Sequence, residues 1–380
     1  MKVLQVLPNL ESGGVERGTV DFAGELVRRG HQSLVMSMGG RLVEQLEAEG
    51  STHVRFPVHE KSLKSLWRVR ALRRLLLELD VDVIHVRSRV PAWMVWLALK
   101  KIPVNKRPAL VSTFHGLYSV SPYSAIMGCG DRVIAISYCV RDYITSNYPK
   151  IDPQKITVVH RGVDTRQFNR EFKLDQQWLD SFHAEYPQLK GKPLIMMPGR
   201  LSRWKGQEQF IELIAALKAE GSDCHGIIVG DPTPGKDAYL QELKDKVASS
   251  RLKNDITFLG HRSDMTNMYA ISSVVCNLSQ HPEPFGRTVI EAMAMGVPVV
   301  AFDCGGPAES LRDCLPQGLV PQNDMSTLKA AVTELLQDSP EFKLPEAFTL
   351  NALASNTLGV YEKALSLSYS STSSNSSKNS

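Results

Sequence analysis

Short apolar runs alternate with amphipathic stretches along most of the chain. The runs have the length and bounding turn residues of buried strands, and the stretches between them repeat their apolar positions at the spacing of a helix. The strands predicted in the first half are Lys2–Leu7, Gln32–Ser37, His53–Pro57, Val83–Val86, Ala109–Phe114, Arg132–Ile136 and Ile156–His160. Those predicted in the second half are Leu194–Met197, Gly226–Val229, Ile256–Leu259, Val274–Leu278 and Val297–Phe302. The predicted helices lie near 15–29, 62–79, 91–101, 138–147, 206–219, 236–250, 264–271 and 287–295.

This alternation of strands and helices predicts parallel, doubly wound sheets, and 380 residues exceed one typical domain. We therefore expect an α/β protein of two Rossmann-like domains facing across a cleft. The N-terminal domain is expected over 1–165 and the second over 193–345, with the charged, strand-free segment 166–192 as their connector. A helix over 346–366 is expected to pack back toward the N-terminal domain. The Ser-rich tail 367–380 has too little apolar surface to order itself, so we expect it to be disordered.

Composition narrows the class of protein. The six cysteines contain no CxxC pair, which favours free thiols in a reducing compartment over a zinc site or a disulfide framework. The opening MKVLQVLPNL has no cleavable signal pattern, and no apolar stretch reaches the roughly 18 residues of a membrane span, so we expect a cytoplasmic protein.

Charge is distributed unevenly between the two halves of the chain. Residues 1–190 carry 27 Lys and Arg against 19 Asp and Glu, whereas residues 191–380 carry 17 Lys and Arg against 21 Asp and Glu. The basic half is expected to meet an anionic partner, and nucleic acid is disfavoured because the cations lack interleaved aromatic platforms.

The segment HPEPFGRTVIEAMAMGVPVVAFDCGG, residues 281–306, combines a loop acid, a Phe-Gly turn and a helix that begins behind a strand. A helix start presents free N–H groups and a partial positive charge that suit a phosphate, and Gly286 has no side chain to keep an anion away. Glu283 in the loop and Glu291 about one turn into the helix are placed to accept hydrogen bonds from sugar hydroxyls on either side of that phosphate. Spacing alone equally fits an ordinary helix-surface acid and a loop acid that complements the helix dipole.

A second charged segment, MPGRLSRWKG, begins where the predicted strand Leu194–Met197 ends. Arg200 offers a bidentate fork to phosphate oxygens, and Lys205 offers a mobile point charge just ahead of a helix. Either cation alone is also what a solvated loop charge looks like. Together at one strand tip they favour a diphosphate.

These segments together resemble the family-4 glycosyltransferases of the GT-B fold, which are retaining enzymes that use sugar nucleotides. GRLSRWKG, the Glu-x7-Glu of EPFGRTVIE, the following EAMAMGVPVVAFDCGGPAE and the earlier RGVDTRQF occur in the family's order, and the resemblance runs from SGGVER to GGPAES. It implies that Arg200 and Lys205 hold the donor diphosphate. It also implies that Glu283 contacts the transferred sugar and that Glu291 contacts the ribose hydroxyls.

The resemblance implies a wider ring of donor contacts. Backbone N–H groups at the Phe-Gly helix start would bind the sugar and phosphates, the Gly-Gly loop after the first strand would approach the phosphates, and LGHRSD would lie beneath the nucleobase. The residues in these roles are Gly13, Gly14, Gly230, Arg262, Asp264, Phe285, Gly286 and Arg287. Gly230 and the Gly-Gly pair are equally compatible with simple turns.

The first half contributes candidates for catalysis and for acceptor binding. His115 follows the strand Ala109–Phe114; a lone histidine is more often structural, but the family places this one near the reacting centre. Arg87 and Arg89, in VRSRVPAW, are candidates for an anionic acceptor. Glu16 is either an acceptor contact or a first-turn acid that complements its helix.

The basic stretch EKSLKSLWRVRALRRLLLELD predicts a helix over 61–79 that combines cations with Leu and Trp. Such a helix suits an anionic membrane surface, on the inner face of the cytoplasmic membrane, or it is a surface helix with a solvated basic face. The arginine-rich strand tip followed by STFHGLYS is most similar to the branch of the family that builds lipopolysaccharide core, including its mannosyltransferases.

The predicted function is therefore a retaining, metal-independent hexosyltransferase without a cofactor. Its donor is expected to be a UDP-, GDP- or ADP-sugar and its acceptor a glycan or glycolipid, with front-face attack in which the donor phosphate takes the acceptor proton. A sugar-nucleotide 2-epimerase of the same fold is the alternative. It would bind donor but need no acceptor.

Overall fold

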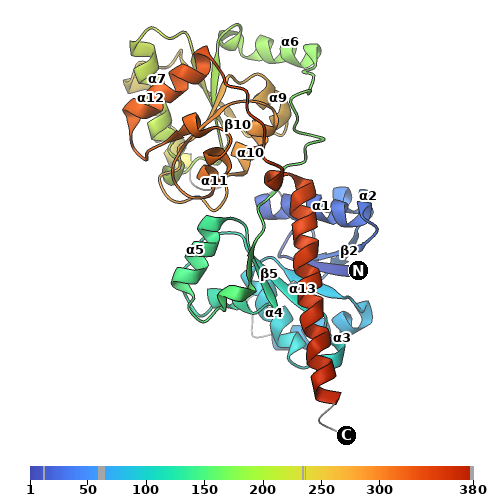
Figure 1. Ribbon diagram of the computed structural model, residues 1–380. Helices are drawn as coiled ribbons and strands as arrows, with labels where there is room; N and C mark the ends of the chain where they lie inside the picture. The colour runs from blue at the N-terminus through green and yellow to red at the C-terminus, as the bar shows by residue number, and fades with distance from the viewer. Residues whose placement is uncertain (12, 59–64, 233–234, 236, 377–380) are drawn as a thin grey trace. The chain divides into compact units, whose positions relative to one another are not determined.

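The computed structural model describes the chain except for residues 12, 59–64, 233–234, 236 and 377–380. The chain divides into two compact units, and each is described by itself. The first unit contains Met1–Gly162 together with the segment that begins at Leu350, and the second contains Val163–Thr349. The prediction of two Rossmann-like parallel-sheet domains is confirmed (Figure 1).

The first unit is built on a seven-stranded sheet of order β3-β2-β1-β4-β5-β6-β7, in which every pairing is parallel. Its strands are β1 (Lys2–Val6), β2 (Gln32–Ser37), β3 (Thr52–Arg55), β4 (Val83–Val86), β5 (Ala109–Phe114), β6 (Arg132–Ala135) and β7 (Ile156–Val158). Its helices are α1 (Gly14–Arg28), α2 (Val43–Ala48), α3 (Ser65–Leu79), α4 (Arg89–Leu99), α5 (Tyr138–Asn147) and α13 (Leu350–Ser376). Lys61 and Lys64 of the predicted basic helix lie outside the described residues.

The last helix, α13, packs on the first unit, against α1, β5 and β6 (Figure 1). Buried side chains from β1, β4, β5, α1 and α13 form one apolar cluster between sheet and helices. Toward the carboxyl edge of the sheet this layer turns polar: Nδ1 of buried His85 lies 2.7 Å from the hydroxyl of Tyr361, and Nε2 lies 2.6 Å from that of Thr113. The polar layer thus begins at the last but one residue of β4 and of β5.

The second unit has a six-stranded parallel sheet of order β10-β9-β8-β11-β12-β13. Its strands are β8 (Leu194–Pro198), β9 (His225–Val229), β10 (Ile256–Gly260), β11 (Val274–Asn277), β12 (Val299–Phe302) and β13 (Leu319–Val320). Its helices are α6 (Gln176–Glu185), α7 (Gln207–Ala219), α8 (Asp237–Ser249), α9 (Met265–Ala270), α10 (Arg287–Ala294), α11 (Gly306–Arg312) and α12 (Met325–Gln337).

Two expectations about the organisation of the chain differ from the structure. The segment 166–192 is not a separate connector: it belongs to the second unit, where Asp175 caps α6 and the ring of Trp178 stacks on that of Phe182. The tail expected to be disordered from 367 onward instead continues α13 as far as Ser376. The helix extends there because the Ser-rich segment directly follows a helix that is already anchored by buried side chains.

Candidate functional site

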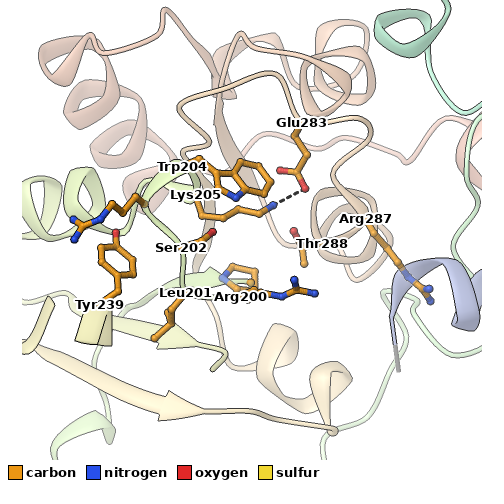
Figure 2. A pocket seen from close by; sticks show the side chains of 12 residues that line it. Arg200, Leu201, Ser202, Trp204, Lys205, Tyr239, Glu283, Arg287 and Thr288 are labelled. Carbon is orange, nitrogen blue, oxygen red and sulfur yellow. Dashed lines mark hydrogen bonds and ion pairs between the residues drawn. The ribbon is translucent and has the colours of Figure 1, made fainter. Parts of the chain in front are cut away.

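A pocket of about 840 Å³ opens at the carboxyl edge of the second sheet. Its walls come from the loop after β8, from Tyr239 on α8 and from the start of α10 (Figure 2). The lining residues are Pro198, Gly199, Arg200, Leu201, Ser202, Arg203, Trp204, Lys205, Tyr239, Glu283, Arg287 and Thr288. The structure thus brings together four of the residues predicted from sequence: Arg200, Lys205, Glu283 and Arg287.

The loop after β8 is held in place by two glycines. Gly206, which precedes α7, has φ 85°, and a Cβ there would lie 2.0 Å from the carbonyl oxygen of Leu278. Gly199 has φ 139°, a conformation that other residues rarely adopt. Between them Arg200 is exposed and Lys205 is half-buried, so the pocket receives one mobile and one fixed cation.

Glu283 is the fixed partner of that second cation. The Nζ of Lys205 lies 2.6 Å from Oε1 of Glu283, while Oε2 accepts hydrogen bonds from Nδ2 of Asn277 (3.1 Å) and Oγ of Ser279 (2.9 Å). Burial alone would raise the pKa of Glu283, but Lys205 and the hydrogen bonds from Asn277 and Ser279 hold it below its usual range. Glu283 is therefore an ionised hydrogen-bond acceptor at neutral pH.

The glycines of FDCGGP explain how this glutamate is positioned. The N–H of Gly306 donates to the carbonyl of Glu283 at 2.7 Å, and a Cβ on Gly305 would lie 2.5 Å from the same oxygen. Gly305 has φ 76°, which favours glycine. The Gly305-Gly306 pair thus holds the backbone of Glu283 at the pocket wall.

Helix α10 begins at this wall. Gly286 is its N-cap with φ 83°, and a Cβ there would lie 2.6 Å from Cγ of Pro307, so the turn requires glycine. Phe285 is buried and packs against Phe348, with ring centroids 6.1 Å apart. Its side chain anchors the turn, and only Arg287 and Thr288 of the first turn of α10 line the pocket.

Glu291 lies deeper than the pocket lining. It is buried, with Oε1 accepting from Nε of Arg287 at 2.7 Å and Oε2 accepting from the hydroxyl of Tyr269 at 2.9 Å. Burial, together with the negative charge of Glu291, raises the pKa of Tyr269 well above its usual range, so Tyr269 remains a donor. The ring of Phe168, from RGVDTRQF, packs edge-on against Tyr269 at 6.1 Å. Glu291 is therefore a buried carboxylate fixed by two hydrogen bonds, and it is not a surface acid.

The remaining donor candidates of the second unit do not line this pocket. Arg262 pairs with Asp264 through Nε–Oδ1 (2.9 Å) and NH2–Oδ2 (2.5 Å), and Nε1 of Trp178 donates to the same carboxylate at 2.9 Å. A Cβ on Gly230 would lie 2.2 Å from the carbonyl oxygen of Gly199. The close approach of two strand tips therefore explains this glycine, in agreement with the turn interpretation.

The carboxyl edge of the first sheet carries a second polar cluster around His115. Nδ1 of His115 lies 3.0 Å from NH2 of Arg161, and Nε2 lies 3.4 Å from Nε of Arg87. Arg161 also donates from NH1 to the carbonyl of Gly14 at 2.8 Å. The structure thus brings His115 together with Arg87 and with the Gly-Gly loop, through an arginine that sequence reasoning had not singled out.

The acceptor candidates are less accessible than expected. Arg87 is buried, its guanidinium bonds to Gln5, and burial lowers its pKa to about 10. Arg89 lies over the rings of Tyr118 and Tyr123 at 4.9 and 5.4 Å and donates to Ser124. Arg87 is therefore held by the polar layer beneath the sheet edge and Arg89 packs against two tyrosines, while a role of either arginine toward an anionic acceptor stays a prediction.

The Gly-Gly loop itself leads directly into α1. Gly13 is the N-cap and Gly14 the first residue of the helix. A Cβ on Gly13 would lie 2.2 Å from Oε2 of Glu16, so the carboxylate of Glu16 folds back over the helix start. That position matches the first-turn acid of the alternative interpretation.

Both halves of the chain match known families. Residues 12–167 match the model described as Glycosyltransferase Family 4, and residues 180–354 match Glycosyl transferases group 1. The crystal structure of a glycosyltransferase from Rickettsia africae ESF-5 is 31% identical, covers 96% of this chain and 98% of its own, and superposes with a TM-score of 0.82.

The chain belongs to the family-4 glycosyltransferases of the GT-B fold. Two more distant relatives of this glycosyltransferase are informative. The lipopolysaccharide core biosynthesis mannosyltransferase LpsB of Rhizobium meliloti (strain 1021) is 29% identical over 203 residues, which are 53% of this chain and 56% of LpsB. Alr3699/HepE of Anabaena, solved in complex with UDP-glucose, has 23% identity over 97% of this chain and 100% of its own, with a TM-score of 0.73.

Several residues of the glycosyltransferase site escaped sequence reasoning. Asn277 ends β11 and Ser279 follows it, while Thr288 and Tyr239 lie in the first turns of α10 and α8 and line the pocket. These four share a position at or just after the end of a strand or at the start of a helix, but so do many residues that have no such role. Tyr269 lies near the end of the short helix α9 and gave no motif.

Proposed function

We propose that this glycosyltransferase transfers a hexose from a nucleotide-diphosphate sugar to a glycan or glycolipid acceptor, with retained anomeric configuration. The observation that carries the proposal is the pocket in which Arg200, Lys205 and the start of α10 surround Glu283. Free N–H groups at a helix start and two cations suit a diphosphate, and an ionised, fixed carboxylate suits sugar hydroxyls. The complex of the related HepE with UDP-glucose supports a donor of this class.

The pocket residues indicate how transfer would proceed. Arg200 and Lys205 would stabilise the negative charge that develops on the leaving diphosphate as the glycosidic bond breaks. Glu283, held by Lys205, Asn277 and Ser279, would orient the sugar, so that the acceptor hydroxyl attacks the same face and passes its proton to a donor phosphate oxygen. In this mechanism Arg200 and Lys205 supply the positive charge at the diphosphate, so we propose that no metal ion is needed.

Donor turnover with and without acceptor tests this function. Purified protein is first screened for thermal stabilisation by UDP-, GDP- and ADP-sugars, since a ligand at about a hundred times its Kd stabilises the folded state by about 2.7 kcal/mol. We expect one nucleotide to stabilise, and its sugar nucleotide to be consumed only when a core oligosaccharide or an alkyl hexoside is present. NMR of the product should show retained anomeric configuration. Conversion of the sugar nucleotide to an epimer without acceptor would identify an isomerase instead.

The acceptor is proposed to lie at the inner face of the cytoplasmic membrane, in lipopolysaccharide core or another envelope polysaccharide. Similarity to LpsB supports this class of acceptor. Among the described residues, no helix has the length and hydropathy to cross a bilayer. Helix α3 exposes Trp67 (74%) and Leu77 (44%) on the face that also carries Arg70 and Arg74. Arg70 lies 5.4 Å above the ring of Trp67, and this mixture of aromatic and cationic groups suits an anionic lipid surface.

Charge reversal on α3 tests the membrane proposal. Changing Arg70, Arg73 and Arg74 to Glu should weaken sedimentation with phosphatidylglycerol vesicles at least about a hundredfold, because each cation near an anionic surface contributes about 1 kcal/mol. The control changes three exposed lysines of the second unit, Lys190, Lys244 and Lys253, to Glu and should bind as wild type. Undiminished sedimentation of the α3 variant would rule this helix out as the contact.

A further inference from the structure

One side chain, Arg161, connects three segments that form the carboxyl edge of the first sheet. It follows β7, donates from NH1 to the carbonyl of Gly14 at the start of α1, and faces Nδ1 of His115 behind β5 with its NH2 group at 3.0 Å. Gly14 and Arg161 are separated by 147 positions in the chain, so the contact is purely tertiary. Arg161 is the first residue of RGVDTRQF, a motif none of whose residues lines the pocket of the second unit.

The surroundings of His115 are strongly cationic. Arg161 approaches one ring nitrogen, Arg87 the other, and buried His85 lies nearby, while the backbone N–H of His115 donates to the hydroxyl of Tyr118 at 3.3 Å. Burial and then Arg161, Arg87 and His85 hold the pKa of His115 well below its usual range. The imidazole is therefore neutral at pH 7, with one N–H and one lone pair.

Two guanidinium groups thus face a ring that can accept only one hydrogen bond in its plane. The contact between Arg161 and Nδ1, at 3.0 Å, has the length of an ordinary N–H hydrogen bond. The Nε–H of Arg87 also points toward Nε2, but its longer separation of 3.4 Å makes it the weaker of the two contacts. The lone pair therefore belongs on Nδ1 and the hydrogen on Nε2.

We propose that Arg161 is a positioning residue that selects the Nε2–H tautomer of His115 and fixes the orientation of its ring. This inference rests on the proposed function, to which it adds the expectation from the family resemblance that His115 lies near the reacting sugar. With this tautomer, Nε2–H of His115 donates a hydrogen bond to a substrate oxygen. Nε2 therefore cannot act as a general base. Arg87, whose Nε–H lies beside Nε2, reinforces the preference for an oxygen that carries negative charge.

NMR of the imidazole nitrogens tests this role without any enzymatic assay. The full chain is labelled with ¹⁵N-histidine, and the His115 signals are identified by their loss in His115→Gln. We expect wild type to show an unprotonated Nδ1 and a protonated Nε2, with the ring protonating only well below the pH at which a free histidine does. In Arg161→Met we expect the two tautomers to mix and the apparent pKa to rise, because a nearby cation and a donor have been removed.

Two further variants keep the result interpretable. Arg161→Lys retains the charge but offers a less rigid donor, so it should stay closer to wild type than Arg161→Met. Arg141→Met removes an exposed arginine of the same unit that pairs with Asp142, and it should leave the His115 spectrum unchanged. If Arg161→Met and Arg161→Lys are both folded by thermal denaturation and show the wild-type tautomer and titration, the proposal is overturned. If Arg161→Met does not fold, Arg161→Gln, which also removes the charge, takes its place and is judged by the same criterion.

Kinetics separate positioning from simple support of the fold. In Arg161→Met, kcat should fall about 10- to 100-fold with little change in donor KM, and the acid limb of the kcat profile should move to higher pH. The direction follows from His115: a cation that opposes its protonation has been removed, so the ring protonates at a higher pH. A lower kcat with an unshifted acid limb would assign Arg161 to the fold alone. Absence of transferase activity in wild type would reject the proposed function and leave the NMR result standing.

Discussion

Replacing Lys205 by methionine is expected to lower kcat/KM about 10²- to 10³-fold. In the proposed mechanism Lys205 stabilises the leaving diphosphate, and it also neutralises Glu283, whose Oε1 lies 2.6 Å from its Nζ. Loss of one preorganised donor at a developing charge has an effect of this size. Steady-state transfer assays with the identified donor measure it.

The same substitution should change the pH dependence of transfer. In wild type, Lys205, Asn277 and Ser279 hold the pKa of Glu283 below its usual range despite burial, so the carboxylate stays ionised to a lower pH than a free glutamate. Its stabilising contribution is present above the pKa of an unfolded glutamate and is lost as pH falls through the lower, folded pKa. Without Lys205 burial dominates and the pKa rises. The acid limb of the kcat profile should therefore move to higher pH in Lys205→Met.

Lys218→Met is the matched control for this prediction. Lys218 forms a comparably buried ion pair with Asp255 in the same unit, at 2.9 Å, and does not line the pocket. It should lose thermal stability to a similar extent while keeping transfer activity and the wild-type pH profile. Equal kcat values for Lys205→Met and Lys218→Met would reject a role for Lys205 in the reaction.

Glu291→Ala is expected to weaken binding of the nucleoside diphosphate about 10- to 100-fold. Tyr269 and Arg287 each use one oxygen of this buried carboxylate, and its remaining lone pairs are available to ribose hydroxyls. Hydrogen bonds to a charged group contribute about 1.5–3 kcal/mol each, which accounts for the range. Calorimetric titration with UDP, GDP and ADP measures the change in Kd.

Glu283→Ala should lower kcat by a larger factor than it lowers nucleotide affinity, because Glu283 would contact the transferred sugar.

Two variants are controls for Glu291→Ala. Tyr269→Phe keeps the carboxylate of Glu291 and removes only the hydroxyl that donates to it, so its Kd should lie between those of wild type and Glu291→Ala. Glu212→Ala removes an exposed acid of α7 that pairs with Lys246, and should bind as wild type. An unchanged Kd in folded Glu291→Ala would contradict the ribose assignment.

The donor half of the site was largely predictable because its chemistry is local in sequence. Arg200 and Lys205 lie within one loop, and Glu283 and Gly286 lie within one turn of each other, so period and spacing place them at the same edge. The partners that control these residues were not predictable. Asn277 and Tyr269 look like ordinary strand and helix residues until folding brings them to Glu283 and Glu291.

The first unit shows the same limit more strongly. Arg87 and Arg89 appear as adjacent surface cations in the sequence, but β4 ends over a buried polar layer that engages Arg87, and two tyrosines enclose Arg89. The order of the elements and the periodicity of their side chains do not show which residues at the ends of different strands contact one another. The missed β13, two residues long, and the helix α6 inside the predicted connector show the corresponding limit for elements whose signal is short or polar.

The sequence by itself determined the two Rossmann-like sheets, the family, and the presence of Arg200, Lys205 and Glu283 at one edge of the second sheet. Each of these depends on residues close together in the chain, where the repeat of strands and helices and the spacing of a motif carry the information. Only the tertiary structure decided that Glu291 is buried beside Tyr269, that Arg87 is internal, and that Arg161 joins Gly14 and His115. Those contacts connect separate strand tips and helices, and the packing of parallel strands, not their order along the chain, brings them within hydrogen-bond distance.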